Sequence, residues 1–170
     1  MKLYKGKIPI IAAEITRVLT DEGDIEAEDK SEVEKDIEAI LKEYLRVERE
    51  IEEEAKDRIA KLGLSYSEFS KTKRLIAKER EFGLGDDGIT YIINQIIQCF
   101  MQSNNVAEVY SDDPTLTVKI RSILRKHMSV DEDIDRLTRE KLKNLEEGSR
   151  EWDVQYNKIM EEIKRKMKLT

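Results

Sequence analysis

The feature that most constrains this chain is the stretch from Ser31 to Leu62, which contains neither glycine nor proline. Apolar residues recur along it three or four positions apart, the spacing that places them on one face of a helix. They are Val33, Ile37, Ile40, Tyr44, Val47, Ile51, Ala55, Ile59 and Leu62. Leu41 and Leu45 widen this stripe in its first half, and nothing widens it in the second. A wide stripe predicts several neighbouring helices, whereas a narrow one predicts a single partner helix.

The composition favours long helices throughout the chain. Charged residues make up 40% of the 170 residues, and only two prolines and seven glycines are present to interrupt helices. The net charge of −6 argues against general binding to nucleic acid or anionic membranes, which requires a basic surface. A single cysteine, Cys99, excludes an internal disulfide and favours a reducing compartment. No apolar run is long enough to span a bilayer, so the sequence predicts an all-α, cytoplasmic protein.

Breaker and capping residues divide the chain into six predicted helices. Their approximate ranges are Pro9–Thr20, Ser31–Leu62, Ser65–Phe82, Ile89–Gln102, Asp113–Glu147 and Arg150–Lys168. Ser31 and Glu34 form a capping-box pattern at the start of the second helix. Since no charged residue occurs between Ile89 and Ala107, the fourth helix is predicted to be the most deeply buried.

The second half of the chain repeats the pattern of the first. At an offset of 83 positions, Ile37, Ile40, Leu41, Leu45, Val47 and Ile51 align with Ile120, Ile123, Leu124, Met128, Val130 and Ile134. Acidic residues align as well, as at Glu48 and Asp131. Any two amphipathic helices share apolar positions, but the matched acids and the common order of three helices favour a duplication. The predicted organisation is repeat one at 1–82, a linker at 83–88 and repeat two at 89–170.

Helix lengths predict how these helices pack. At about 1.5 Å per residue, the first helix is too short to cover more than the first half of the second. The uncovered half is expected to pair with the returning third helix as an antiparallel hairpin, and the same holds in repeat two. Acidic residues on the outgoing helices and basic residues on the returning ones favour this pairing. We therefore expect two tandem three-helix repeats with pseudo-twofold symmetry, in which a four-helix bundle base carries two projecting helical-hairpin arms.

Five short motifs carry a resemblance that covers the chain from end to end. They are Met1–Pro9, Gly23–Glu26, Phe82–Gly85, Ile92–Gln95 and Leu124–Met128. On these motifs the chain resembles a bacterial family known as domain of unknown function 507. The resemblance implies an intracellular bacterial protein. It carries over no catalytic residues, because the family has no assigned activity.

The motifs that might carry chemistry give little support to an enzyme. Gly83, Gly85 and Gly88 spell a G-x-G-x-x-G pattern, but a helix precedes it where a dinucleotide fold needs a strand. We interpret this segment as an interhelical linker. His127 has no Cys or His neighbours in the pattern of a zinc site, and we interpret it as a helix-face residue near the edge of the core. We interpret Cys99 as a small core residue. No catalytic residue, metal site or cofactor is predicted.

One group of residues is expected to gather where the base gives way to the arms. Tyr44 and His127 are equivalent under the repeat, and antiparallel packing would bring the starts of the first and fourth helices beside them. The resulting site, which we call the fork, consists of Tyr4, Lys5, Lys7, Tyr44 and His127 with the loop 83–88. Clefts between elements are common ligand sites. Ordinary packing at a junction is the alternative.

Ser129 is predicted to be a hinge of the second arm. Where repeat one continues as Leu45-Arg46-Val47, repeat two has Met128-Ser129-Val130. Ser129 and Glu132 form a further capping-box pattern, which offers the backbone a new helix start. A straight helix with Ser129 facing solvent is the alternative.

The sequence leaves two functions open. The first is a helical adaptor or scaffold that binds another macromolecule, expected to be a protein, between or along its arms. The absence of a catalytic constellation and the elongated, charged shape favour it. The second is a small-molecule binding protein or enzyme that uses the fork. A homodimer is a further alternative, and neither nucleic acid nor a membrane is an expected partner.

Overall fold

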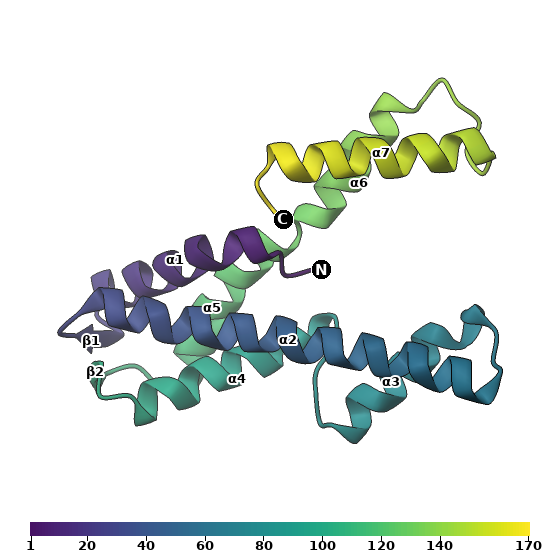
Figure 1. The fold of residues 1–170 in the computed structure, drawn as a ribbon. Coiled ribbons are helices and arrows are strands. Elements are labelled where there is room, and N and C mark those ends of the chain that lie inside the picture. Colours follow the sequence, from purple (N-terminus) through teal and green to yellow (C-terminus); the bar gives the residue numbers. More distant parts are fainter.

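The computed structural model describes residues 1–170 as a mostly helical chain with one small sheet (Figure 1). The helices are α1 (Ile8–Asp21), α2 (Lys30–Leu62), α3 (Phe69–Glu79), α4 (Asp86–Gln102), α5 (Asp113–Met128), α6 (Val130–Lys141) and α7 (Arg150–Lys166). The 3₁₀ turns η1 (Lys5–Lys7) and η2 (Tyr66–Glu68) precede α1 and α3, and the strands are β1 (Ile25–Ala27) and β2 (Val106–Val109). The predicted helical class is confirmed, whereas the sheet was not predicted.

Four helical segments enclose the main core: α1, the first half of α2, α4 and α5, which we call the body. Each segment has apolar residues at helical spacing, so it turns one apolar face inward and buries it. The most buried side chains of the body include Ile11, Ile15, Ile37, Leu41, Ile92, Ile96, Ile120 and Leu124, all with no exposed surface. Charged residues are absent from α4 after Asp87. Six residues of this helix, between Ile89 and Phe100, lie in the main core.

The strands β1 and β2 join the two halves of the chain at one end of the body. They pair antiparallel, with Ile25 opposite Val109. Strands this short do not show a recognisable period-two pattern in a sequence. Beside them, the buried carboxylate of Asp24 accepts hydrogen bonds from Lys119 Nζ (2.7 Å) and Ser111 Oγ (2.6 Å). Although burial opposes ionisation, these hydrogen bonds hold the pKa of Asp24 below its ordinary value.

Two helix starts differ from the prediction. α2 begins at Lys30, because the Asp29 carboxylate accepts a hydrogen bond from the Ser31 N–H (3.0 Å) and caps the helix. The predicted capping role of Ser31 is therefore wrong. α4 begins at Asp86 rather than Ile89. Acidic side chains are favourable in the first turn of a helix, where they face the positive end of the helix dipole.

The fifth predicted helix is interrupted at Ser129. α5 ends at Met128 and α6 begins at Val130, with Ser129 at φ −84° and ψ 3° between them. The Ser129 hydroxyl donates to the Lys126 carbonyl (3.4 Å) and makes no capping bond to α6. The prediction of one helix from Asp113 to Glu147 is therefore wrong, and so is the capping bond expected from the Ser129 side chain.

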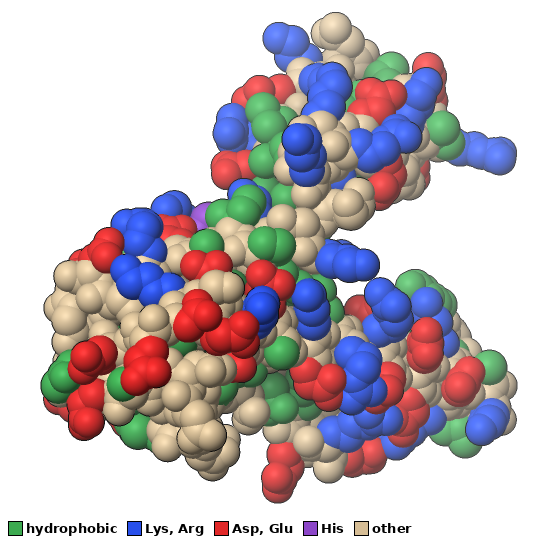
Figure 2. Space-filling view, turned by 60° about the vertical axis from the view of Figure 1, so that its left-hand side comes forward, with side chains coloured by type: hydrophobic (Ala, Val, Ile, Leu, Met, Phe, Trp, Pro, Cys, Tyr) green, Lys and Arg blue, Asp and Glu red, His purple; other side chains and the backbone are tan.

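Two helical hairpins extend from the body (Figure 1). In the first hairpin the second half of α2 packs against α3, and in the second hairpin α6 packs against α7. The space-filling view shows the surface indented between them (Figure 2). Buried residues of the first hairpin, such as Ile51 and Ile76, belong to the main core. The second hairpin has a separate core of five buried residues, namely Tyr4, Val130, Ile134, Ile163 and Leu169.

Candidate functional site

The first six residues, which we call the strap, cross from the body to the second hairpin. The Lys2 N–H donates to the Met128 carbonyl at the end of α5 (3.0 Å). The Gly6 N–H donates to the Leu169 carbonyl, which follows α7 (3.1 Å). The first bond holds the strap to the body and the second holds it to the second hairpin, so the strap fastens the two together beside the junction at Ser129.

Tyr4, the first fork residue, lies within the strap and is 7% exposed. Its ring packs into the core of the second hairpin, while its neighbour Leu3 packs into the main core. The amines of Lys2 and Lys164 lie 5.4 and 5.9 Å from the centre of the ring, where the π face attracts cations. Burial, together with the negative charge of Asp131, raises the pKa of Tyr4. Tyr4 is therefore a packing residue at the junction.

Lys5 and Lys7 lie in the 3₁₀ turn η1, directly before α1. Lys5 is exposed and Lys7 is half-buried. Neither amine forms an ion pair or a side-chain hydrogen bond within the chain. The turn before α1 therefore carries two positive charges without an ion-pair partner in the chain.

Tyr44 projects from α2 toward the loop that precedes α4. Its hydroxyl donates to the Gly83 carbonyl (3.0 Å), and its ring stacks on Phe82 with centroids 4.8 Å apart. A side chain at Gly88 would place its Cβ 2.2 Å from the Tyr44 hydroxyl, which explains why glycine is needed there. Burial, with a smaller effect of the Glu48 charge, raises the pKa of Tyr44. The fork residues of loop 83–88 therefore meet Tyr44, as the sequence suggested.

His127 lies on α5 and faces α1. Its Nε2 contacts the Glu14 carboxylate, which also accepts a hydrogen bond from Lys126 Nζ (2.7 Å). His127 is 8% exposed. Although burial opposes it, the hydrogen bonds from Lys126 and His127 hold the pKa of Glu14 below its ordinary value. This group lines a shallow depression whose rim also includes Arg17.

Tyr44 and His127 line different depressions of the surface. The depression at His127 lies between α1, the start of α2 and α5, whereas the one at Tyr44 lies between α2 and α4. Tyr4 belongs to a third environment, the core of the second hairpin. The structure thus brings Tyr44 together with loop 83–88 and leaves Tyr4 and His127 apart from them.

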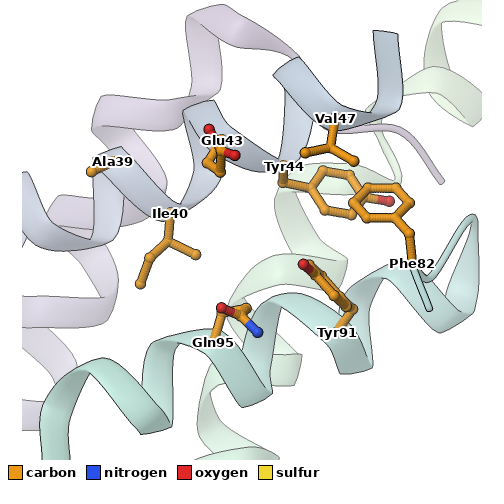
Figure 3. Close-up of a pocket in the computed structure, with 8 residues that line it drawn as sticks. All are labelled: Ala39, Ile40, Glu43, Tyr44, Val47, Phe82, Tyr91 and Gln95. Carbon is orange, nitrogen blue, oxygen red and sulfur yellow. The ribbon is translucent and has the colours of Figure 1, made fainter. Parts of the chain in front are cut away.

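The depression at Tyr44 is an aromatic pocket of about 240 Å³ (Figure 3). Phe82 and Tyr91 complete its aromatic wall, with their ring centroids 5.0 Å apart. Ile40 and Gln95 lie at its other end. The heptad stripe of α2 already placed Tyr44 and Ile40 on one face. Nothing in the sequence pointed to Tyr91, because its position depends on how α4 packs against α2.

Two further observations bear on chemistry and location. No group of three or more His, Cys, Asp or Glu side chains is arranged to hold a metal ion. None of the helices combines the length and the apolar character that crossing a membrane requires.

These features define a mostly helical protein in which two hairpins extend from one body. The chain belongs to the family described as "Protein of unknown function (DUF507)", whose model matches residues 1–169. The predicted family resemblance is therefore confirmed over nearly the whole chain. No curated protein matches the sequence.

Proposed function

We propose that this protein is a two-armed helical adaptor that holds another protein between its hairpins. The observation that carries the proposal is the unequal attachment of two hairpins flanking an indented surface (Figure 2). One hairpin shares the main core, and the other has a small core of its own. A fixed arm and a less tightly held arm together suit the capture and release of a partner.

The two hairpins are proposed to be the arms of a duplicated unit, with repeat one at 1–82 and repeat two at 89–170. Equivalent elements have equivalent neighbours: α1 packs on α5 as α4 packs on α2, and β1 pairs with β2. Ile37 and Ile120, which align at the repeat offset, are both fully buried. A pseudo-twofold axis through the body accounts for these pairings.

The second arm is proposed to turn about Ser129. The helix is interrupted at that residue, and the separate core of the second arm begins at the next one, Val130. Elements with few contacts to the rest of a protein open at low free-energy cost. The strap limits this motion, because Lys2 and Gly6 bond to both sides of the junction.

The proposed partner is a protein rather than a nucleic acid. Both arms alternate acidic and basic side chains on their surfaces (Figure 2), whereas nucleic acid requires a continuous basic face. Lys5 and Lys7, which have no ion-pair partner in the chain, flank Gly6, whose N–H bonds to the end of the second arm. They are proposed to bind acidic groups of the partner.

Site-specific photocrosslinking in the native cell tests the adaptor function. A photoreactive residue in place of Lys5, within the strap, is expected to crosslink one specific protein. The same residue at Thr115, an exposed position at the far end of α5, is the matched control and should not capture it. Identical products from both positions, or none from Lys5, would contradict the proposal.

The alternative function, a small-molecule binding protein or enzyme, is favoured by a different observation. The aromatic pocket between α2 and α4 has three rings in its wall and an open side (Figure 3). It includes only Tyr44 of the five predicted fork residues. A ligand there would bind independently of the indentation between the arms.

A further inference from the structure

The aromatic pocket continues into a neighbouring depression along the line where α2 faces α4. The two depressions share Ile40 and Gln95, and their volumes are about 240 and 410 Å³. Together they form one elongated depression, which we call the α2–α4 groove. Its α2 side is marked by Asp36, Ile40, Glu43 and Val47, which the helical repeat places on one face. The groove is therefore long and narrow, with apolar and acidic positions alternating along one side.

The charge of the groove has a single sign. Asp36 and Glu43 line it, and neither depression has a Lys, Arg or His among its lining residues. Lys and Arg make up 31 of the 170 residues, so a lining without them is a distinct feature. Asp36 accepts hydrogen bonds only from the uncharged side chains of Ser103 and Asn105, so its negative charge has no ion-pair partner in the chain. Glu43 accepts two hydrogen bonds from Arg46 (2.6 and 2.8 Å), which partly offset its charge. The groove is complementary to a cation.

The aromatic end of the groove adds a second means of binding cations. Tyr44, Phe82 and Tyr91 form its wall, and the faces of aromatic rings attract ammonium groups (Figure 3). The Tyr91 hydroxyl and the Gln95 amide have no hydrogen-bond partner within the chain. Their oxygens are free to accept hydrogen bonds from a bound ammonium. Between the two acidic positions, Ala39 and Ile40 present only carbon.

We propose that the α2–α4 groove binds a linear aliphatic polyamine. One terminal ammonium lies between Glu43 and the aromatic wall, and the other lies beside Asp36. The chain between them crosses Ile40, with its secondary ammonium beside the amide oxygen of Gln95, which lines both depressions. Asp36 and Glu43 are seven residues apart on α2, which separates them by about 10 Å along the helix axis. A ligand with ammonium groups at that separation satisfies both carboxylates at once, whereas a shorter or singly charged amine satisfies one. This binding is separate from the adaptor function and does not depend on the arms.

Isothermal titration calorimetry with spermidine, putrescine and hexylamine tests the proposal. We expect spermidine to bind with one site per chain, the shorter putrescine more weakly, and the singly charged hexylamine most weakly. Glu43→Gln and Asp36→Asn are each expected to weaken spermidine about fivefold, the upper end for an exposed ion pair. Asp36→Asn keeps the one oxygen that accepts from both Ser103 and Asn105. Glu43→Gln keeps one of the two oxygens that accept from Arg46.

Asp57→Asn is the matched control, since Asp57 is an exposed carboxylate of the same helix outside the groove. It should leave spermidine affinity unchanged. The proposal is overturned if hexylamine binds as tightly as spermidine, if Glu43→Gln and Asp36→Asn bind like the parent protein, or if Asp57→Asn weakens binding equally. The last result would mean that spermidine binds through the overall negative charge of the protein and not in the groove. None of these results depends on the partner sought by crosslinking.

Discussion

The two hairpins have the same architecture and differ in how they are attached. α2 runs without interruption from the body into the first hairpin, and Ile51 and Ala55 on its far half still belong to the main core. In the second hairpin, Ser129 interrupts the helix at the matching place, and the core beyond it is separate. A hairpin that shares a core unfolds with the body, whereas one with its own core can open alone.

Ion pairs show the same contrast. Across the first hairpin, Arg58 binds Glu79 (2.7 Å) and Lys73 binds Glu52 (2.9 Å). No ion pair joins α6 to α7. The ion pairs of α6 lie within that helix, reach the following loop or, at Asp131, bind the Met1 amine of the strap (3.4 Å). The predicted charge pairing between outgoing and returning helices therefore occurs in the first hairpin only. The second hairpin is held together by apolar packing, by the hydrogen bond from Tyr156 to Asp135 (2.5 Å) and by the Arg139 guanidinium over the Trp152 ring (5.4 Å).

The largest expected effect comes from a charge in the core that both halves share. Ile96 on α4 is fully buried, and an unpaired carboxylate there costs several kcal/mol. We expect Ile96→Asp to unfold the body and both hairpins, as measured by circular dichroism. A soluble variant with an unchanged melting temperature would show that α4 is not central to the core.

A matched pair of cavity mutations compares the hairpins directly. Ile51→Ala and Ile134→Ala each remove a buried side chain, at a cost of about 3 kcal/mol in the free energy of unfolding. We expect Ile51→Ala to raise hydrogen exchange throughout the body. Ile134→Ala should raise it in α6 and α7 while the body stays protected. Equal effects on the body from both variants would mean that the second hairpin is not an independent unit.

Displacing the strap is expected to have a smaller effect on hydrogen exchange, confined to the second hairpin. A Cβ at Gly6 would lie 1.9 Å from the Lys168 carbonyl oxygen, so the strap cannot keep its place in Gly6→Ala. We expect faster hydrogen exchange in α6 and α7, with the body unchanged. Lys5→Ala is the control, because the Lys5 side chain is exposed. Unaltered exchange in Gly6→Ala would show that the strap does not hold the second hairpin.

The smallest expected effect contrasts Tyr44 with the Glu14–His127 pair by how the free energy of unfolding depends on pH. Glu14 has a lowered pKa because it accepts hydrogen bonds from Lys126 and His127. Its contribution to stability is therefore complete above its ordinary pKa of 4.5 and is lost as the pH falls through the lower value of the folded state. We expect Glu14→Gln to lower the free energy of unfolding by about 1 kcal/mol at pH 7. This difference should shrink in denaturant titrations below pH 4.5, and a constant difference would contradict the assignment. Tyr44→Phe should show no such dependence between pH 4 and 7, because the tyrosine hydroxyl stays neutral there.

The sequence predicted the features of this fold that depend on local pattern. Heptad spacing without glycine or proline was sufficient to predict the long α2, and the absence of charged residues after Asp87 was sufficient to predict that α4 is buried. The β1–β2 pair was missed because its stability comes from contacts between distant segments, including the bonds to Asp24. The capping box predicted at Ser31 did not form. The Ser31 N–H, which the Glu34 side chain was expected to cap, donates to Asp29 instead.

The sequence predicted less of the candidate site than of the fold. Tyr44 and loop 83–88 meet because the chain returns to α2 after the first hairpin, which the helix lengths implied. Tyr91 and Gln95 were missed because the rotation of α4 about its axis decides which of its polar residues face α2. His127 is apart from Tyr44 because it lies on α5 and contacts Glu14 of α1, whereas Tyr44 lies on α2 and contacts loop 83–88.

Distances between spin labels test the central claim, that the second hairpin moves about Ser129 while the first is fixed. Labels at Lys61 and Thr115 report the first hairpin against the body, and labels at Asn144 and Thr115 report the second, both in a Cys99→Ser background. The account predicts a narrow distance distribution for the first pair and a broader one for the second. Ser129→Ala should narrow the second distribution, because alanine favours a continuous helix. Two equally narrow distributions, both unaltered by Ser129→Ala, would contradict it.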